Sequence, residues 1–82
     1  SNRLHAELLR VALEAGDGGN FAEVQRPPTH AELASRISSH REAVSREMRR
    51  LSDAGIVTRG RGKLVFSDLD RLRDMVEEVK GG

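Results

Sequence analysis

The chain has 82 residues, a length that predicts one small domain with a modest hydrophobic core. Hydrophobic residues make up 37% and charged residues 33%, which is typical of a folded globular domain rather than a disordered tail. The lack of cysteine excludes disulfides and thiolate metal sites. No apolar run approaches the roughly 18 residues of a membrane span and no secretory leader is visible, so we expect a cytoplasmic protein with no membrane partner.

The net charge of +1 is unevenly distributed along the chain. Residues 36–63 contain eight basic and three acidic residues, a net charge of +5, whereas the segments before and after them each carry −2. A basic middle between acidic flanks is the pattern expected where one face contacts a polyanion such as nucleic acid. A solvated, salt-bridged surface would give the same totals, so charge alone leaves both interpretations open.

The first part of the chain predicts a helix, a possible short strand and a second, shorter helix. Residues 4–15 form the first helix, because apolar residues recur there at helical spacing: Leu4, Leu8, Val11 and Ala15. The glycine-rich stretch 16–20 ends it, and the alternation over residues 21–25 favours a short strand that two prolines terminate. Residues 29–32 match the capping box S/T-x-x-E and open a helix. Its residues available to the core are Ala31, Leu33, Ala34 and Ile37.

A third helix is predicted to begin at a second capping box, residues 39–42, after an interruption at Ser38 and Ser39. It continues to about Ser52, and Gly55 follows it where a helix commonly ends. Its inner, apolar face consists of Val44, Met48 and Leu51. Its outer, polar face consists of Arg41, Glu42, Ser45, Arg46 and Arg49.

The last part predicts a β-hairpin and a final helix. Residues 56–58 and 64–66 are runs of strand formers around a loop, residues 59–63, that contains glycine and three basic residues. Asp68 caps a helix over about residues 68–80, whose apolar stripe consists of Leu69, Leu72, Val76 and Val79. The fold is therefore mainly α with a small β-hairpin. We predict one winged helix-turn-helix domain over residues 1–82, with the helix-turn-helix at about 29–52 and the wing at about 56–66.

The outer face of the third helix suits the major groove of B-DNA, which admits one α-helix and exposes base edges to the first residues of that helix. Arg41 and Arg46 can each donate two hydrogen bonds to guanine, and Glu42 can accept one from cytosine. A protein that binds phosphates alone needs only basic residues. The acidic residue among the arginines therefore favours sequence-specific reading of duplex DNA.

The residues that carry this pattern also resemble a known family. THAELA at residues 29–34, followed by HREAVSR at residues 40–46, is similar to the C-terminal DNA-binding domain of the Crp–Fnr family of bacterial transcription regulators. The resemblance covers roughly residues 4–66. It implies that Arg41, Glu42 and Arg46 read bases. It places the DNA backbone near the helix-turn-helix and the wing, and the predicted backbone contacts are Thr29, His40, Ser45, Arg49, Arg59, Arg61 and Lys63.

The family resemblance also sets expectations for the whole protein. Members work as homodimers on two half-sites, carry a separate sensor domain for a cyclic nucleotide or other effector, and have RNA polymerase as a possible partner. This chain lacks that sensor domain, so we expect it to be a fragment of a longer regulator and to bind no cofactor itself. Three departures stand out: Ser38 where the family usually has glycine, His40 where it has a small polar residue, and the additional C-terminal helix.

Plainer interpretations of the same residues remain open at this point. Glu42 can serve only as the partner of a capping box, and the hairpin bases can simply protect an edge strand from aggregation. The three histidines share no ligand spacing and no nucleophile is placed beside a base, so neither a metal site nor an enzyme is predicted. The alternative function is a winged helix that serves as a protein-interaction or dimerisation module and does not bind DNA. Such a module would expose apolar residues on the outer face of the third helix.

Overall fold

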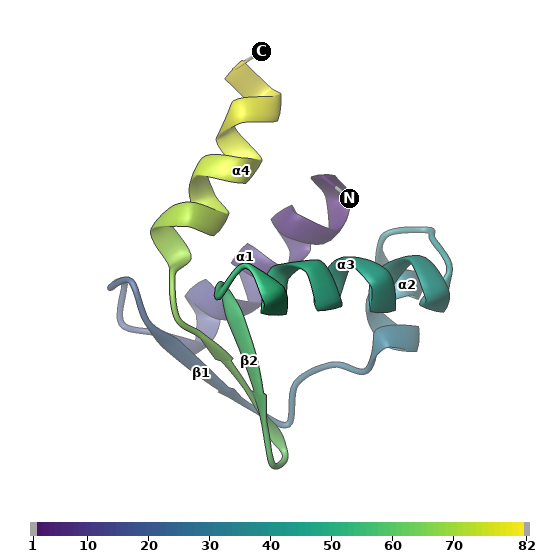
Figure 1. Ribbon diagram of the computed structural model, residues 1–82, viewed down its shortest axis with the longest axis horizontal. Coiled ribbons are helices and arrows are strands. Elements are labelled where there is room, and N and C mark those ends of the chain that lie inside the picture. Colours follow the sequence, from purple (N-terminus) through teal and green to yellow (C-terminus); the bar gives the residue numbers. More distant parts are fainter. Residues whose placement is uncertain (1, 82) are drawn as a thin grey trace.

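The computed structural model describes residues 2–81, and within the last helix it describes the side chains as far as Glu78. Four helices and three strands follow one another in the predicted order (Figure 1). Their bounds are α1 Asn2–Ala15, β1 Ala22–Gln25, α2 His30–Arg36, α3 Arg41–Asp53, β2 Val57–Gly60, β3 Lys63–Phe66 and α4 Leu69–Gly81. The predicted Val79 lies outside the side chains described. In the described part of the chain, no helix is long and apolar enough to cross a membrane.

The possible strand near the N-terminus is confirmed, and it belongs to the same sheet as the hairpin. The three strands are antiparallel in the order β1-β3-β2, so β3 is central and pairs with both of the others. Strand β1 starts at Ala22 rather than Phe21, whose side chain is exposed. The alternating burial along β1 and β3 places Ala22, Val24, Leu64 and Phe66 on the covered face of the sheet.

The hairpin is tighter than predicted. Instead of a loop over residues 59–63, the chain reverses at Arg61 and Gly62, and Gly60 pairs directly with Lys63. Gly62 has a φ of 66°, a left-handed conformation that glycine adopts without a steric penalty and that lets two residues complete the turn. Arg59 and Lys63 consequently lie on strands, and only Arg61 lies at the tip with a side chain. Ile56 precedes β2 instead of belonging to it, although it is buried.

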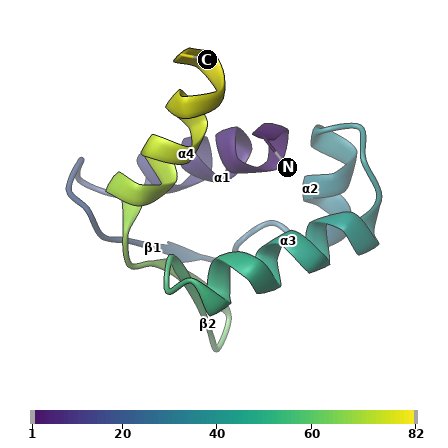
Figure 2. The ribbon, with the colours of Figure 1, turned by 45° about the horizontal axis from the view of Figure 1, so that its top comes forward.

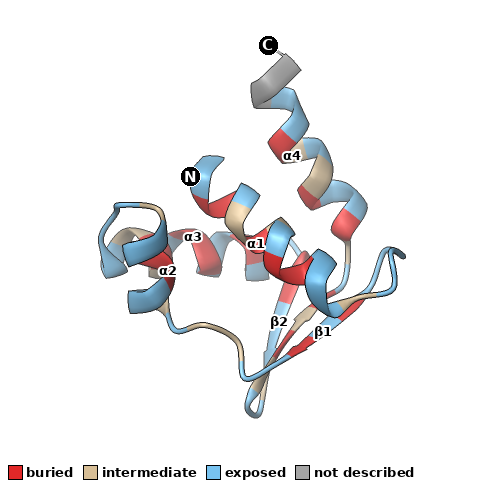
Figure 3. Ribbon diagram, turned by 180° about the vertical axis from the view of Figure 1, so that it is seen from behind, coloured by how far each residue is buried: buried red, intermediate tan, exposed pale blue. Residues whose placement is uncertain are grey.

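The core lies where α1, α3 and α4 face one another and the sheet, as the buried segments in Figure 3 show. Two predicted core residues are exposed instead, Ala15 and Ala31. Ala15 is the last residue of α1, and beyond it Gly16 makes the close contact with β1. A Cβ on Gly16 would lie 3.1 Å from the Cβ of Ala22 and 3.2 Å from the carbonyl oxygen of Ala12. Ala12, which is fully buried, takes the place predicted for Ala15.

The first turn of α2 is capped by Thr29 and does not contribute to the core. Ala31 lies in this exposed turn, and Leu33 and Ala34 in the next turn are buried. The predicted capping box is confirmed: the Thr29 hydroxyl accepts from the Glu32 amide at 3.0 Å, and the Glu32 carboxylate accepts from the Thr29 amide at 3.0 Å. These hydrogen bonds lower the pKa of Glu32 below its ordinary value.

The predicted second capping box does not form. Helix α3 begins at Arg41, its N-cap residue is His40, and the His40 side chain makes no capping hydrogen bond. Glu42 is therefore the second helical residue rather than the third, too early to reach back to the N-cap amide. The predicted apolar face of α3 is confirmed, since Val44, Met48 and Leu51 are buried.

Helix α4 packs on α1 and is fixed at its beginning by side chains from elsewhere. Leu69, Leu72 and Val76 are buried, as the apolar stripe predicts. Asp68 caps the helix, as predicted, by accepting from the Arg71 amide at 3.2 Å. A contact that the sequence did not indicate comes from the loop after α1, where Asn20 accepts from the amides of Leu69 and Asp70 at 3.0 and 2.6 Å.

A buried polar pair joins α1 to α3. The Nε2 atom of His5 and the carboxylate of Glu47 are 2.6 Å apart, and these residues are only 8% and 5% exposed. The Arg50 guanidinium donates to the other carboxylate oxygen of Glu47 at 3.2 Å. Because a buried charge is stable only when it is hydrogen-bonded, this contact restricts how α3 can rotate against α1.

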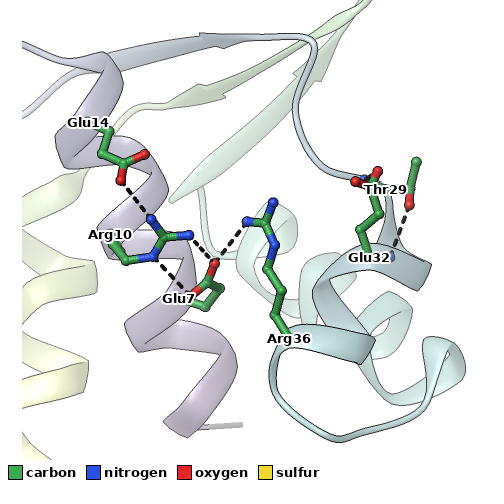
Figure 4. Close-up of polar contacts among 6 residues, drawn as sticks. All are labelled: Glu7, Arg10, Glu14, Thr29, Glu32 and Arg36. Carbon is green, nitrogen blue, oxygen red and sulfur yellow. Dashed lines mark hydrogen bonds and ion pairs between the residues drawn. The ribbon is translucent and has the colours of Figure 1, made fainter.

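An ionic network joins α1 to α2 on the surface (Figure 4). The Glu7 carboxylate accepts from Arg10 at 2.6 Å and from Arg36 at 2.9 Å, and Arg10 also reaches Glu14 at 2.7 Å. The hydrogen bond from Arg10, assisted by that from Arg36, lowers the pKa of Glu7 below its ordinary value of 4.5 against the opposing effect of burial. The ionised form of Glu7 is thus the one that stabilises the fold.

Both helices of the helix-turn-helix end in the same motif. After α3, the amides of Gly55 and Ile56 donate to the carbonyls of Ser52 and Leu51, with Gly55 left-handed at a φ of 78°. After α2, the amides of Ser38 and Ser39 donate to Ser35 and Ala34 in the same way. The left-handed residue here is Ser38, with a φ of 55°. Ser38 stands where the family usually has glycine, and its side chain disfavours this left-handed conformation.

We predict that Ser38→Gly raises the free energy of unfolding by about 0.5–1 kcal/mol, because it removes the steric cost of the left-handed conformation. Denaturant unfolding monitored by circular dichroism measures the change. The matched variant Ser39→Gly alters a residue that is not left-handed, so it lowers stability by making the unfolded chain more flexible. A stability loss in Ser38→Gly equal to that in Ser39→Gly would contradict the strain at Ser38.

We predict that Glu7→Gln lowers the free energy of unfolding at pH 7 by about 1–2 kcal/mol, because two guanidinium groups lose their carboxylate. Since the pKa of Glu7 is lower in the folded protein, its contribution is fully present above pH 4.5 and disappears as the pH falls through the folded pKa. The difference between wild type and variant should therefore shrink in acid. Glu14→Gln, which removes only a partner of the exposed Arg10, should have a much smaller effect.

Candidate nucleic-acid interface

The outer face of α3 and the hairpin lie on one side of the molecule, and α1 and α4 lie on the other (Figure 2). Arg41, Glu42 and Arg46, the predicted base readers, are all exposed in the first two turns of α3. Arg49 follows on the same face one turn later and is also exposed. The structure therefore brings together the four charged side chains that the sequence placed on this face.

Side-chain partners distinguish two groups of arginines, and Arg59, whose guanidinium contacts His30, belongs to neither. In α1, α4 and at Arg36 and Arg50, every arginine side chain contacts an acid or a backbone carbonyl. By contrast, no hydrogen bond or ion pair within the described chain engages the side chains of five other arginines: Arg26, Arg41, Arg46, Arg49 and Arg61. Three of these lie on the outer face of α3, and two lie at or beside the tip of the hairpin. Within the described chain, the arginines whose side chains have no partner are thus confined to one side of the domain.

The predicted backbone contacts have different surroundings. Thr29 is exposed, and although its hydroxyl caps α2, the hydroxyl hydrogen remains able to donate. His40 is exposed directly before α3. In the hairpin, Arg61 is fully outward at the turn, whereas the Lys63 ammonium lies 3.4 Å from the Glu23 carboxylate on β1. Lys63 therefore carries charge that is already partly compensated.

His30 joins three elements of the site and was not among the residues predicted from the sequence. Its Nδ1 atom is 2.8 Å from the Ser45 hydroxyl on α3, and its Nε2 atom is 3.3 Å from the Arg59 guanidinium on β2. Burial, together with the nearby charges of Arg59 and Arg41, lowers the pKa of His30 below its ordinary value of 6.5. The imidazole is consequently neutral at pH 7 and can accept a hydrogen bond on one nitrogen.

Arg26 is the second residue that sequence reasoning missed. It lies between β1 and α2, and its amide donates to the carbonyl of Gly62 at 3.0 Å, so its exposed side chain is beside the tip of the hairpin. Nothing local predicts this position, because it results from the pairing of β1 with β3. The only indication in the sequence is that this basic residue directly precedes the prolines before the helix-turn-helix.

Two short helices joined by a tight turn, with the second helix exposed beside a two-stranded wing, define a winged helix-turn-helix domain. The family model for Crp-like helix-turn-helix domains matches residues 2–75, and the chain belongs to this family. The resemblance inferred from residues 29–46 and the predicted fold class are therefore confirmed.

Individual relatives agree with this assignment. The transcriptional regulator SdrP of Thermus thermophilus is 32% identical over 76 residues, which are 93% of this chain and 38% of that protein. A solved Crp/Fnr-family regulator, also from Thermus thermophilus, is 31% identical with a TM-score of 0.73, over 93% of this chain and 39% of that one. Oxidised CprK shares the fold at 18% identity with a TM-score of 0.80, over 93% of this chain and 32% of that one. This chain thus spans less than two fifths of the length of each.

Proposed function

We propose that this domain binds double-stranded DNA in a bacterial transcription regulator, with α3 in the major groove and the wing on the sugar-phosphate backbone. The observation that carries the proposal is the confinement of the unpaired arginines to the side formed by α3 and the hairpin. Membership of the Crp-like family and the likeness to transcriptional regulators support it. A polyanion is the partner whose charge complements this side of the domain.

The first turns of α3 support specific rather than uniform binding. Arg41 and Arg46 offer paired donors that match guanine, and Glu42 offers an acceptor that matches the amino group of cytosine. Glu42 does not form the predicted capping box, so its carboxylate is available for a base or for orienting an arginine. The proposed backbone contacts are Thr29, His40, Ser45, Arg49, Arg59, Arg61 and Lys63, to which the structure leads us to add Arg26.

The alternative, a module that binds proteins, has less support. The outer face of α3 exposes arginine and glutamate side chains, and the large apolar side chains recorded as exposed, Leu13 and Phe21, belong to α1 and the following loop. We further propose that the full-length protein is a cytoplasmic homodimer on two half-sites, because the domain spans only part of its regulator relatives and one small interface supplies few phosphate contacts.

We predict that DNA selection with this domain, dimerised through a coiled coil fused before α1, enriches a palindromic site at fixed salt. Arg41→Ala and Arg46→Ala should each relax the preference at particular base pairs, by about 1–3 kcal/mol of discrimination. Arg50→Ala is the matched control on the same helix, because that side chain pairs with the buried Glu47 and is not among the predicted DNA contacts.

The selected sequences distinguish the two functions. Direct reading by α3 is supported if Arg41→Ala and Arg46→Ala lose the preference at different base pairs and Arg50→Ala still selects the wild-type site. Weak binding without sequence enrichment, identical in all four proteins, would contradict it and favour the protein-binding alternative.

A further inference from the structure

A groove of about 340 Å³ runs between α3 and the wing. Its polar lining includes His30 from α2, Ser45, Arg49 and Ser52 from α3, and Arg59 from β2. Asp53 also lines it, but eight residues after Ser45, which on an α-helix is about 12 Å along the axis. Ser45 and Arg59, which contact His30, thus line one part of the groove, Asp53 lies two turns further along α3, and Arg49 lies between Ser45 and Asp53.

The direction of the hydrogen bonds at this end follows from the chemistry of the groups. A guanidinium has donors only, so the contact between Arg59 and Nε2 of His30 requires Nε2 to be the acceptor. A neutral imidazole then carries its proton on Nδ1 and donates it to the Ser45 hydroxyl at 2.8 Å. Ser45 accepts this hydrogen bond, so its own hydroxyl hydrogen is left to donate toward the groove.

The surrounding charges favour this arrangement. Burial, together with the charges of Arg59 and Arg41, lowers the pKa of His30 and so favours the neutral imidazole. Arg49 adds a further positive charge, and within the described chain no acid pairs with Arg41, Arg49 or Arg59. What complements one hydroxyl and two guanidinium groups, from Arg49 on α3 and Arg59 on β2, is an anion with more than one acceptor oxygen.

We propose that His30 is a positioning residue that holds the Ser45 hydroxyl and the Arg59 guanidinium toward one DNA phosphate in this groove. The proposal rests on the proposed function and deepens it. His30 does not contribute charge to the phosphate site. Instead it fixes the side chain that does, and in doing so it links the recognition helix to the wing.

The free protein tests the hydrogen-bond arrangement without DNA. Long-range ¹H–¹⁵N correlation spectra of the imidazoles at neutral pH should show His30 with its proton on Nδ1. In Arg59→Ala the population should move toward the form protonated on Nε2, because the donor to Nε2 is gone. Arg61→Ala, which removes an arginine at the hairpin tip, should leave the wild-type spectrum. A wild-type His30 protonated on Nε2 would overturn the proposal.

DNA binding tests the positioning. His30→Ala should weaken binding of the dimerised domain to its selected site by about tenfold and reduce the slope of log K against log salt by about 0.9 per half-site, one phosphate contact. A neutral side chain can change that slope only by displacing a charged one. Accordingly, His30→Ala should have almost no further effect when Arg59→Ala is already present. His30→Gln, which keeps a donor and an acceptor, should restore part of the affinity, and circular dichroism checks that each variant is folded.

The outcomes separate this proposal from the proposed function. If Arg41→Ala abolishes specific binding but His30→Ala leaves the affinity and the salt slope unchanged, the positioning role is wrong and DNA binding stands. If the wild-type domain binds no DNA at all, the proposed function fails, and the phosphate site fails with it even where the His30 tautomer is as expected.

Discussion

The rotation of α3 about its own axis is the constraint on which the rest of the site depends. A helix that presents arginine and glutamate to a partner must bury the opposite side completely, and α3 does so with Val44, Met48 and Leu51. Apolar packing alone allows α3 some rotation about its axis. The His5–Glu47 contact restricts that rotation, because a buried carboxylate has few positions in which it is hydrogen-bonded. A rotated α3 would expose apolar side chains and separate the Glu47 carboxylate from His5.

Two further features fix the position of the wing. Strand β1 pairs with the hairpin to form a three-stranded sheet, whose apolar face is covered by α1. The same pairing brings Arg26 beside the tip of the hairpin. On the other side, His30 connects the Arg59 side chain of the wing to Ser45 of α3. The result is that polar contacts through His30, as well as the apolar side chains of Met48, Val57 and Leu64, lie between α3 and the wing.

Sequence reasoning was accurate wherever a local interaction decides the outcome. The apolar periodicities of α3 and α4, that of α1 as far as Val11, and the capping box at Thr29 all depend on residues within a few positions of one another. It failed where two local signals competed: residues 39–42 read as a capping box, but the motif that ends α2 uses the Ser39 amide, and α3 starts one residue later than the box requires. The length of the hairpin turn was misjudged because Gly60 can pair in a strand as well as turn.

The contacts that assemble the site could not be predicted from the sequence, for a different reason. His5 meets Glu47 across 42 residues, His30 meets Arg59 across 29, and Arg26 meets Gly62 only because β1 pairs with β3. Such pairs leave no periodicity in a single sequence. Helical spacing identified the residues of the outer face, but it could not indicate which arginines the fold would leave without partners. That distribution is the main evidence for the proposed DNA interface.

The most direct test of this account is an NMR titration of the ¹⁵N-labelled domain with its selected DNA duplex. The account predicts that the largest amide shifts fall on Arg41, Glu42, Arg46 and Arg49 of α3 and on Arg59 and Arg61 of the wing, while α4 changes little. Shifts concentrated on α4 or around Leu13 and Phe21, with the outer face of α3 unchanged, would contradict it.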